Sequence, residues 1–199
     1  KMYSETEKPI SIVVVPAINK STAADAANLV NSTLTIPFAD NGYYVLPISI
    51  VSDIFRREGL IEGSQIQGIP LDMFKTSFGA DSVLYITINK WDTNYIVLAA
   101  NVVVGMSYVL RSTTDSEVLW SYDQEIVVNT SGDSTGFLLA DIIKTAVTTA
   151  MTDYIPIARQ VNATAVATMP YGKYHPLNNT DADAKVVLTR SKEKALAPS

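Results

Sequence analysis

Residues 95–111, "YIVLAANVVVGMSYVLR", constrain the fold more than any other part of this chain. Every second residue of the segment is apolar, whereas the positions between them include Asn101, Gly105 and Ser107. A period of two residues is that of a β-strand, in which successive side chains point to opposite faces of a sheet. The segment therefore predicts one long strand with a wholly apolar face, formed by Ile96, Leu98, Ala100, Val102, Val104, Met106, Tyr108 and Leu110.

Strand-like runs flank this segment on both sides. Residues 81–91, "DSVLYITINKW", precede it, and residues 117–128, "EVLWSYDQEIVV", follow it. The connections "DTN" and "STTDS" are short and consist of turn-forming residues, which suits hairpins between antiparallel strands. The middle of the chain therefore predicts an antiparallel meander.

The preceding part of the chain alternates strands with helices. Two runs, residues 10–17 and 43–48, are typical of buried strands. Helices are predicted over Ala26–Leu34, from a cap at Ser49 or Ser52 to a stop at Gly59, and over Pro70–Gly79. This alternation favours parallel pairing through right-handed crossovers. The sequence thus predicts an α/β (α+β) fold with a mixed sheet of about five strands, first parallel and then a meander, covered by helices.

The segment after the meander predicts a covering helix. Apolar residues recur at helical spacing over residues 138–151, and this stripe should lie on the apolar face of the sheet. From Pro156 onward the periodicity weakens and the chain becomes polar. We therefore expect a flexible segment over residues 1–9, a single α/β domain over 10–160 and an extended, partly disordered C-terminal arm over 161–199.

Composition limits the classes of partner. The 199 residues carry a formal net charge of −5, with an isoelectric point near 4.8. Nucleic acid is therefore not expected as a partner. The chain contains no cysteine for a disulfide or a thiolate metal site. No apolar run approaches the roughly 20 residues of a membrane-spanning helix. The abrupt start at "KMYSETEKP" is what removal of a targeting segment would leave.

One short motif raises the question of catalysis. Residues 132–136, "GDSTG", fit the G-x-S-x-G pattern of a serine-hydrolase nucleophile elbow. Asp141, Asp153 and the only histidine, His175, follow in the order that an α/β-hydrolase triad needs. A small serine hydrolase that uses Ser134, His175 and Asp141 or Asp153 is therefore the alternative function.

The context of the motif favours a plain loop. Asn129 to Ser131 separate it from the preceding strand, which belongs to an antiparallel hairpin and not to a central parallel position. No Gly-rich loop elsewhere in the sequence could supply oxyanion-hole amides. A loop in which Ser134 or Asp133 caps the next helix is the simpler interpretation. The chain is therefore not expected to be an enzyme.

No cofactor or metal site is expected either. The turn after the first strand, "PAINKSTAAD", lacks the glycines and the spacing of a P-loop, and one histidine without cysteine argues against a zinc site. Asp53 and Arg57, one helical turn apart, are typical of a solvated ion pair. Near the C terminus, Tyr171, Tyr174 and His175 form an aromatic cluster. This cluster should fasten the C-terminal arm to the domain or present aromatic surface to a partner.

Five stretches carry a family resemblance. They lie within residues 10–176 and read "ISIVVVPAINKS", "FADNGYYVLPISIVSDIFRREGL", "FGADSVLYITINKWDTNY", "SEVLW" and "YGKYHP". In this order and spacing they resemble a family of bacterial outer-membrane lipoproteins of unknown function that includes a meningococcal vaccine-candidate antigen. The predicted element order, β-α-β-α-α-β-β-β-α, also resembles the amino-terminal domain of TolB and the curli-secretion lipoprotein.

The resemblance implies a location and a role. Members of the family carry a lipidated cysteine shortly before the first strand, which here would lie upstream of Lys1. The resemblance therefore implies a non-enzymatic periplasmic lipoprotein, anchored to the outer membrane by lipid, that acts as an accessory in an envelope export or assembly complex. Its partners would be envelope proteins, and it could form a homo-oligomer. The single apolar face of residues 95–111 predicts a domain that does not itself span the membrane.

Overall fold

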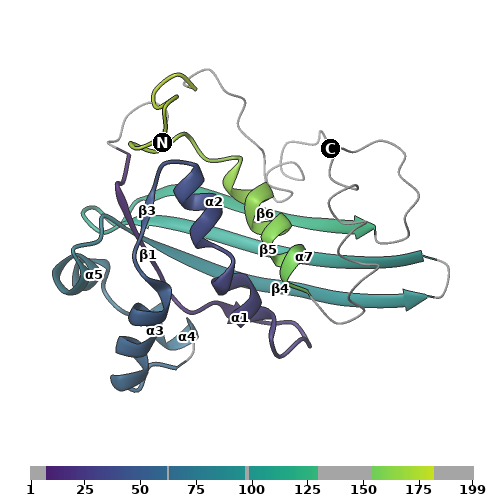
Figure 1. Ribbon diagram of the computed structural model, residues 1–199. Helices are drawn as coiled ribbons and strands as arrows, with labels where there is room; N and C mark the ends of the chain where they lie inside the picture. Colours follow the sequence, from purple (N-terminus) through teal and green to yellow (C-terminus); the bar gives the residue numbers. More distant parts are fainter. Residues whose placement is uncertain (1–7, 62, 97–98, 130–153, 182–199) are drawn as a thin grey trace, which may run out of the picture.

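A mixed sheet of six strands organises the chain (Figure 1). The computed structural model describes residues 8–61, 63–96, 99–129 and 154–181. The strands are β1 (Ser11–Val14), β2 (Ile18–Asn19), β3 (Tyr44–Val45), β4 (Ser82–Ile96), β5 (Ala99–Ser112) and β6 (Val118–Asn129). The helices are α1 (Ala26–Ser32), α2 (Thr35–Asp40), α3 (Ile48–Arg57), α4 (Gly63–Ile66), α5 (Leu71–Phe78) and α7 (Ile155–Val166).

The sheet has a parallel half and an antiparallel half, in the order β3-β1-β4-β5-β6 with β2 also paired to β4. Strand β1 pairs in parallel with β3 and with β4, whereas β4, β5 and β6 pair antiparallel as a meander. The predicted mixed α/β fold is therefore confirmed, with β2 as a short additional strand. Strand β4 belongs to both halves and joins them.

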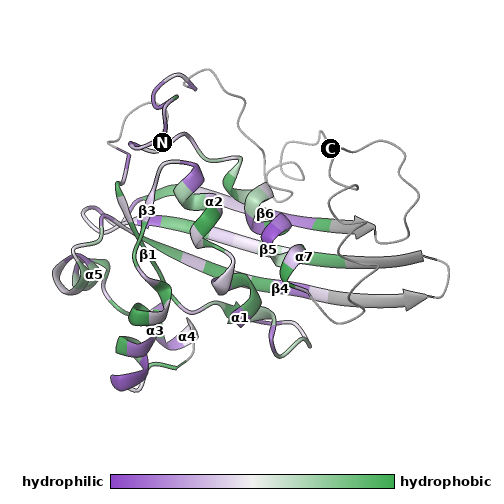
Figure 2. Ribbon diagram, in the orientation of Figure 1, coloured by the Kyte–Doolittle hydropathy of each residue, from purple (hydrophilic) through white to green (hydrophobic). Residues whose placement is uncertain are grey.

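The apolar face of β5 lies in the main core, as its period of two predicts. Val104, Met106, Tyr108 and Leu110 are fully buried in this core. Helices α1, α2 and α7 lie together over this face of the sheet (Figure 1), and Figure 2 shows mostly hydrophobic colouring along β1 and the described part of β4. The side chains of the rest of the predicted face lie outside what the structure describes. The predicted turn at residues 92–94 and the predicted strand start at residue 95 are wrong: β4 continues through Ile96 and pairs there with β5, which begins at Ala99.

A second, smaller core covers the opposite face of β1 and of the start of β4. Helices α3, α4 and α5 supply its side chains, which pack against Val13, Val15 and Val83. Phe55 and Phe74 meet there edge to face, with ring centroids 6.1 Å apart. Helices cover both faces of β1, and the run Ile12–Val15 is accordingly apolar and buried throughout, as is typical of parallel strands.

The helix boundaries follow the glycine and proline signals in part. Gly59 and Gly79 have positive φ values of 77° and 65°, and they end α3 and α5 as predicted. Helix α3 begins at Ile48, after Pro47, and therefore earlier than a cap at Ser49 or Ser52 would place it. Pro37 lies within the first turn of α2, where its missing N–H costs no helical hydrogen bond.

Helix α7 differs from the prediction for the C-terminal part of the chain. We expected the pattern to weaken at Pro156 and an extended arm to begin at residue 161, but the helix continues to Val166. Pro156 occupies its first turn, which tolerates proline. Buried Ile157, Ala158 and Val161 pack into the main core. The helix that was predicted over residues 138–151 lies outside the described residues.

A buried polar contact fixes α7 against its neighbours. Asn162 is fully buried, and its Oδ1 accepts a hydrogen bond from the Tyr108 hydroxyl of β5 at 2.6 Å. Its Nδ2 donates to the Val30 carbonyl of α1 at 3.0 Å and to Thr33 Oγ1 at 2.8 Å. Burial raises the pKa of Tyr108 far above its ordinary value, so the hydroxyl keeps the proton that it donates.

We expect Tyr108→Phe to lower the free energy of unfolding by about 1–3 kcal/mol, because it leaves the buried Asn162 Oδ1 without its donor. Urea denaturation followed by circular dichroism measures the change. Tyr44→Phe is the matched control, because Tyr44 is 53% exposed and should change stability by less than about 0.5 kcal/mol. Equal stability of the two variants would contradict the role assigned to Asn162.

Candidate functional site

The chain after α7 turns back and closes over the loop before β3. We call residues 170–181 the closing segment. Gly172 N donates to the Asn41 carbonyl at 2.8 Å, and Tyr174 N donates to the Gly42 carbonyl at 3.1 Å. The two glycines permit this approach, because a Cβ on Gly172 would lie 2.4 Å from the Gly42 oxygen and Gly42 itself has a φ of +87°. The closing segment is thus attached by its backbone.

The predicted aromatic cluster divides into a packed pair and an outward side chain. The rings of Tyr171 and His175 stack in parallel, with centroids 3.9 Å apart. His175 Nδ1 accepts a hydrogen bond from Leu177 N at 3.1 Å. In contrast, Tyr174 is 67% exposed and Leu177 is 49% exposed. Two residues therefore shape the closing segment, and the other two offer apolar surface to solvent.

Lys8 joins the beginning of the described chain to the closing segment. Its ammonium donates to the Tyr171 carbonyl at 2.9 Å and to Asn178 Oδ1 at 3.3 Å. It also lies 3.6 Å from Asp181 Oδ1, and both charged side chains are largely buried. Asp181 Oδ2 in turn accepts from Tyr171 N at 2.6 Å. The point where the chain enters the domain is therefore fixed to the closing segment.

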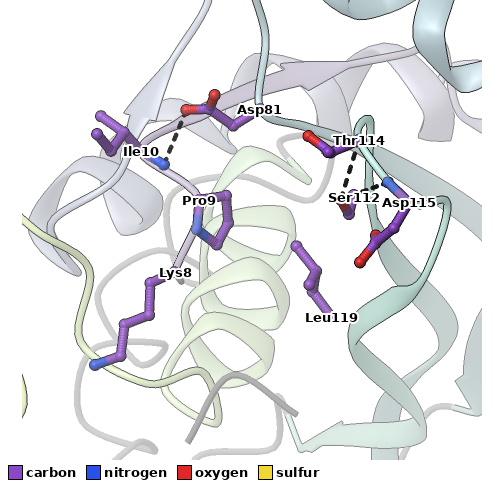
Figure 3. Close-up of a pocket in the computed structure, with 8 residues that line it drawn as sticks. All are labelled: Lys8, Pro9, Ile10, Asp81, Ser112, Thr114, Asp115 and Leu119. Atoms are coloured by element: carbon purple, nitrogen blue, oxygen red, sulfur yellow. Dashed lines mark hydrogen bonds between the residues drawn. The ribbon is translucent and has the colours of Figure 1, made fainter. Parts of the chain in front are cut away.

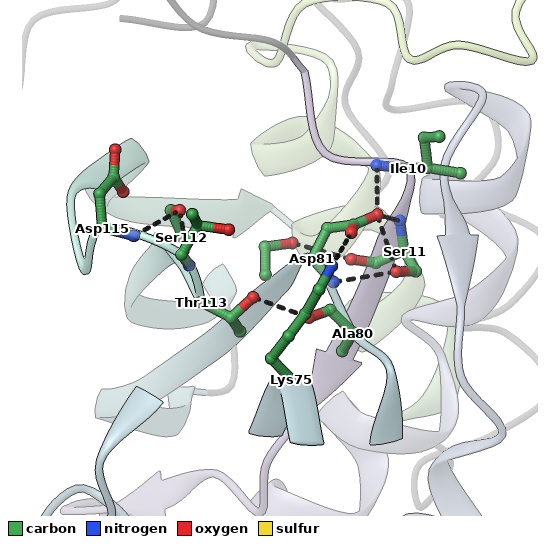
Figure 4. A network of polar contacts seen from close by, with 10 residues as sticks. Ile10, Ser11, Lys75, Ala80, Asp81, Ser112, Thr113 and Asp115 are labelled. Carbon is green, nitrogen blue, oxygen red and sulfur yellow. Dashed lines mark hydrogen bonds and ion pairs between the residues drawn. The ribbon is translucent and has the colours of Figure 1, made fainter. Parts of the chain in front are cut away.

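The carboxylate of Asp81 organises the start of β1 (Figure 4). Its Oδ2 accepts from Ile10 N, Ser11 N and Ser11 Oγ at 3.0–3.2 Å, and its Oδ1 accepts from Lys75 Nζ at 2.6 Å. Burial alone would raise the pKa of this carboxyl, but the Lys75 ammonium and the donors of Ser11 and Ile10 outweigh burial. The pKa of Asp81 is therefore held below its ordinary value.

A cavity of about 300 Å³ lies beside this network, between the incoming chain and the turn that joins β5 to β6 (Figure 3). Pro9 and Leu119 are buried and form its apolar part. Thr114 and Asp115, on the turn, form an exposed polar rim. The full lining comprises Lys8, Pro9, Ile10, Asp81, Ser112, Thr114, Asp115 and Leu119.

The proposed hydrolase residues are only partly described. Three of the residues lie outside the part of the chain that the structure describes: Ser134, Asp141 and Asp153. The structure therefore gives no distance from any of them to His175. His175 itself has an arrangement that differs from that of a triad base. In a triad, Nδ1–H donates to the carboxylate and Nε2 receives the serine proton, whereas here Nδ1 accepts from Leu177 N. The surroundings of His175 therefore give the hydrolase hypothesis no support.

The remaining sequence candidates are structural. Asp53 pairs with Arg56 at 2.7 Å, three residues away, and not with Arg57 as expected. Both partners of this pair are well exposed. Across the ranges that the structure describes, no group of three or more His, Cys, Asp or Glu residues could hold a metal ion.

Nothing in the sequence indicated the role of Lys8. Only the Asn41-Gly42 dipeptide, a common turn signal, indicated the loop that receives the closing segment.

Comparison with known proteins places this arrangement in a family. The family model described as "Putative lipoprotein GNA1162-like" matches residues 2–173. The chain belongs to this family. A relative from Neisseria meningitidis serogroup B, "Putative lipoprotein NMB1124/NMB1162", is 29% identical over 148 residues, which cover 73% of this chain and 69% of the relative. The family match includes both Gly42 and Gly172, so the contact between these two glycines falls within the family's extent, which ends at residue 173.

Two solved structures resemble the chain, one of them a lipoprotein from the same family and the other similar in fold. The crystal structure of lipoprotein GNA1162 from Neisseria meningitidis has a TM-score of 0.59 and 28% identity, and the match covers 71% of this chain and 96% of that one. A PelC variant from Paraburkholderia phytofirmans has a TM-score of 0.51 and 15% identity, over 81% of this chain and 93% of that one. This second likeness concerns the fold alone.

We expect Gly172→Ala to detach the closing segment, because its Cβ would meet backbone atoms of Gly42 that have little freedom to move. The cost should be about 1–3 kcal/mol of unfolding free energy. Trypsin should then cleave after the exposed Lys173 faster than in the parent chain. Gly68→Ala is the matched control, since a Cβ there meets nothing within 4 Å. Unchanged cleavage of the Gly172 variant would mean that the segment is held elsewhere.

The Asp81 network predicts a loss of stability in acid. Because the folded-state pKa lies below the ordinary value of 3.8, the contribution is complete well above that pH and is lost as the pH falls through the folded-state pKa. Asp81→Asn should therefore lower the urea midpoint at about pH 7 and reduce the difference between about pH 7 and about pH 3. Asp53→Asn should leave this difference unchanged. Parallel pH profiles for the Asp81 variant and the parent would contradict the assignment.

Proposed function

We propose that this chain is the folded domain of a non-enzymatic periplasmic lipoprotein, anchored to the outer membrane, that serves as an accessory in an envelope export or assembly complex. Membership of a lipoprotein family implies a membrane-anchored location in the envelope. The lipid would be carried by a cysteine upstream of Lys1. Within the described residues no helix is long and apolar enough to cross a bilayer, and attachment through an upstream lipid would not require one.

The position of Lys8 is the observation that carries this proposal. Lys8 is the first described residue, and its ammonium is bonded to the closing segment. A chain that arrives from a lipid would therefore enter the domain at the closing segment, which also carries the exposed Tyr174. In Figure 1 the far end of β4 lies at the other side of the sheet. Since β4 has 15 residues, that end would stand about 50 Å away along the strand.

This geometry gives an anchored domain two ends with different surroundings. The end with Lys8 and the closing segment faces the anchor, and the far ends of β4, β5 and β6 point away from it. We propose that Tyr171, Tyr174 and His175 form part of the surface that contacts envelope partners. Tyr174 supplies the exposed aromatic area, a feature enriched at protein interfaces, while the stacked Tyr171 and His175 hold it in place.

Self-association is a further part of the proposal. The PelC variant that shares this fold is a dodecamer, which motivates a test of the oligomeric state of this chain. Light scattering on the purified chain, with and without its anchor, measures that state directly. The proposal of an envelope accessory does not depend on the outcome, because a monomer can also act as an adaptor.

Expression of the full precursor with its native N terminus tests the anchor. We expect recovery in the outer-membrane fraction and a lipid-modified N-terminal peptide in mass spectrometry. Substitution of the lipidated cysteine by serine should release the protein into the soluble periplasmic fraction. A parent precursor that is itself soluble would overturn the lipoprotein part of the proposal.

The same cells test the partner surface. A photocrosslinking amino acid at position 174 should capture distinct envelope proteins, whereas the same amino acid at Asp123, which is also exposed but lies on β6, should capture markedly less. Tyr174→Ser should reduce capture from a crosslinker at Leu177 severalfold. Equal capture from positions 174 and 123 would remove the closing segment from the partner surface.

A further inference from the structure

The sequence contains a single Asn-Gly dipeptide, Asn41-Gly42, and it lies where the closing segment attaches. Asn-Gly is prone to spontaneous deamidation, because glycine has no side chain to hinder attack by its own amide nitrogen. In this reaction the Gly42 nitrogen loses its proton to solvent and bonds to Asn41 Cγ, while the Cγ–Nδ2 bond breaks and the nitrogen takes up a proton to leave as ammonia. Water then opens the succinimide ring to aspartate or isoaspartate.

The attacking and the attacked groups are both held apart from this reaction. Gly42 N donates to the Ala39 carbonyl at 2.9 Å. Asn41 Nδ2 donates to the Pro170 carbonyl at 3.2 Å. Attack requires Asn41 to rotate until the Gly42 nitrogen lies over Cγ, and both hydrogen bonds oppose that rotation. The closed arrangement therefore protects the dipeptide.

The closing segment supplies much of this restraint. Pro170, which holds the Asn41 amide, is its first residue. Gly172 N donates to the Asn41 carbonyl at 2.8 Å, and Tyr174 N donates to the Gly42 carbonyl at 3.1 Å. Opening of the segment would remove these bonds together and leave the dipeptide held by the end of α2. Because the open state must form first, the rate of deamidation should follow its equilibrium population.

The product does not suit the closed arrangement. Aspartate at position 41 has no N–H donor for the Pro170 carbonyl, which also accepts from the Tyr43 hydroxyl at 2.7 Å. A carboxylate oxygen would then face a carbonyl oxygen. Isoaspartate also inserts a carbon atom into the main chain beside Gly172, where even an added Cβ would lie 2.4 Å from the Gly42 oxygen. Either product therefore favours the open segment.

We propose that Asn41 is a site of spontaneous deamidation controlled by the closing segment. The site is protected while the segment is closed, reacts when the segment opens, and then prevents it from closing again. The inference does not depend on the proposed function. It does concern the surface that carries the exposed Tyr174, because deamidation converts a reversible opening into a permanent change of that surface.

Incubation of the purified chain at neutral pH, followed by tryptic digestion, measures the reaction. Tandem mass spectrometry of the fragment that spans residues 21–56 locates the change at Asn41, and labelling by isoaspartyl methyltransferase identifies isoaspartate. The unprotected reference is the capped synthetic peptide "FADNGYYV", residues 38–45. We expect the parent chain to react at least about tenfold more slowly than this peptide. Equal rates would overturn the protection.

Two variants open the segment in different ways. Gly172→Ala should raise the deamidation rate about fivefold or more, because its Cβ detaches the segment. Lys8→Ala removes the ammonium that binds the Tyr171 carbonyl without inserting an atom into a backbone contact, and it should raise the rate about two- to threefold. If Gly172→Ala does not fold, as judged by circular dichroism, Lys8→Ala decides. An unchanged rate in the deciding variant would overturn control by the segment.

Tyr108→Phe is the matched control for general destabilisation. It weakens the domain at Asn162, away from the closing segment, and should leave the deamidation rate of Asn41 at the parent value. Acceleration equal to that of Gly172→Ala would mean that the reaction follows unfolding of the whole domain. That result would also overturn control by the segment.

Asn41→Asp tests whether the product keeps the segment open. The variant carries the carboxylate of the product on a normal main chain, and trypsin should cleave it after the exposed Lys173 about threefold or more faster than the parent chain. Asn28→Asp places the same charge at an exposed position of α1 and should leave cleavage unchanged. Equal cleavage of the two variants would mean that the closed segment accepts the product, which would overturn the irreversible step.

Discussion

The buried amide of Asn162 determines how the helical layer lies on the sheet. Apolar packing between α7 and β5 has little directionality, so many rotations of the helix would bury similar area. The amide has fixed directions, and it reaches Tyr108 on β5 as well as Val30 and Thr33 at the end of α1. Any rotation of α7 would leave these buried polar groups without hydrogen-bond partners and out of reach of water. One side chain thus selects a single arrangement of three elements.

The same residue explains why sequence reasoning succeeded with the strands and failed with α7. Period-two patterning predicted β5, because one face of residues 95–111 is wholly apolar. Strand-like runs joined by short turn-type connections predicted β4 and β6. In α7, the buried stripe contains Asn162 and two alanines, Ala158 and Ala165. Asn is ordinarily a surface residue and alanine carries little hydrophobic signal, so the stripe resembles a polar arm. Its burial depends on donors and acceptors that other parts of the chain provide.

The candidate site was predictable in composition but not in geometry. The aromatic cluster was recognisable from neighbouring residues, but backbone hydrogen bonds attach the segment to the domain, and Tyr171 and His175 stack on each other within it. Which ring points outward depends on the turn at Gly172 and on its approach to Gly42, and the local sequence does not encode that approach. Lys8 bonds to a carbonyl 163 residues away, and such a pairing leaves no periodic signal. The cavity is also formed by segments distant in sequence.

The order of these elements along the chain has a consequence for biogenesis. Ribosomes make β5 well before α7, and the segment that bonds to Lys8 comes later still. Until α7 has been synthesised, the apolar face of β5 lacks the helix that carries Asn162. The nascent chain therefore exposes a long apolar strand face that is prone to aggregation. Closure of the domain is therefore a late, whole-chain event. During synthesis and transport such a chain is the kind of client that chaperones shield from aggregation.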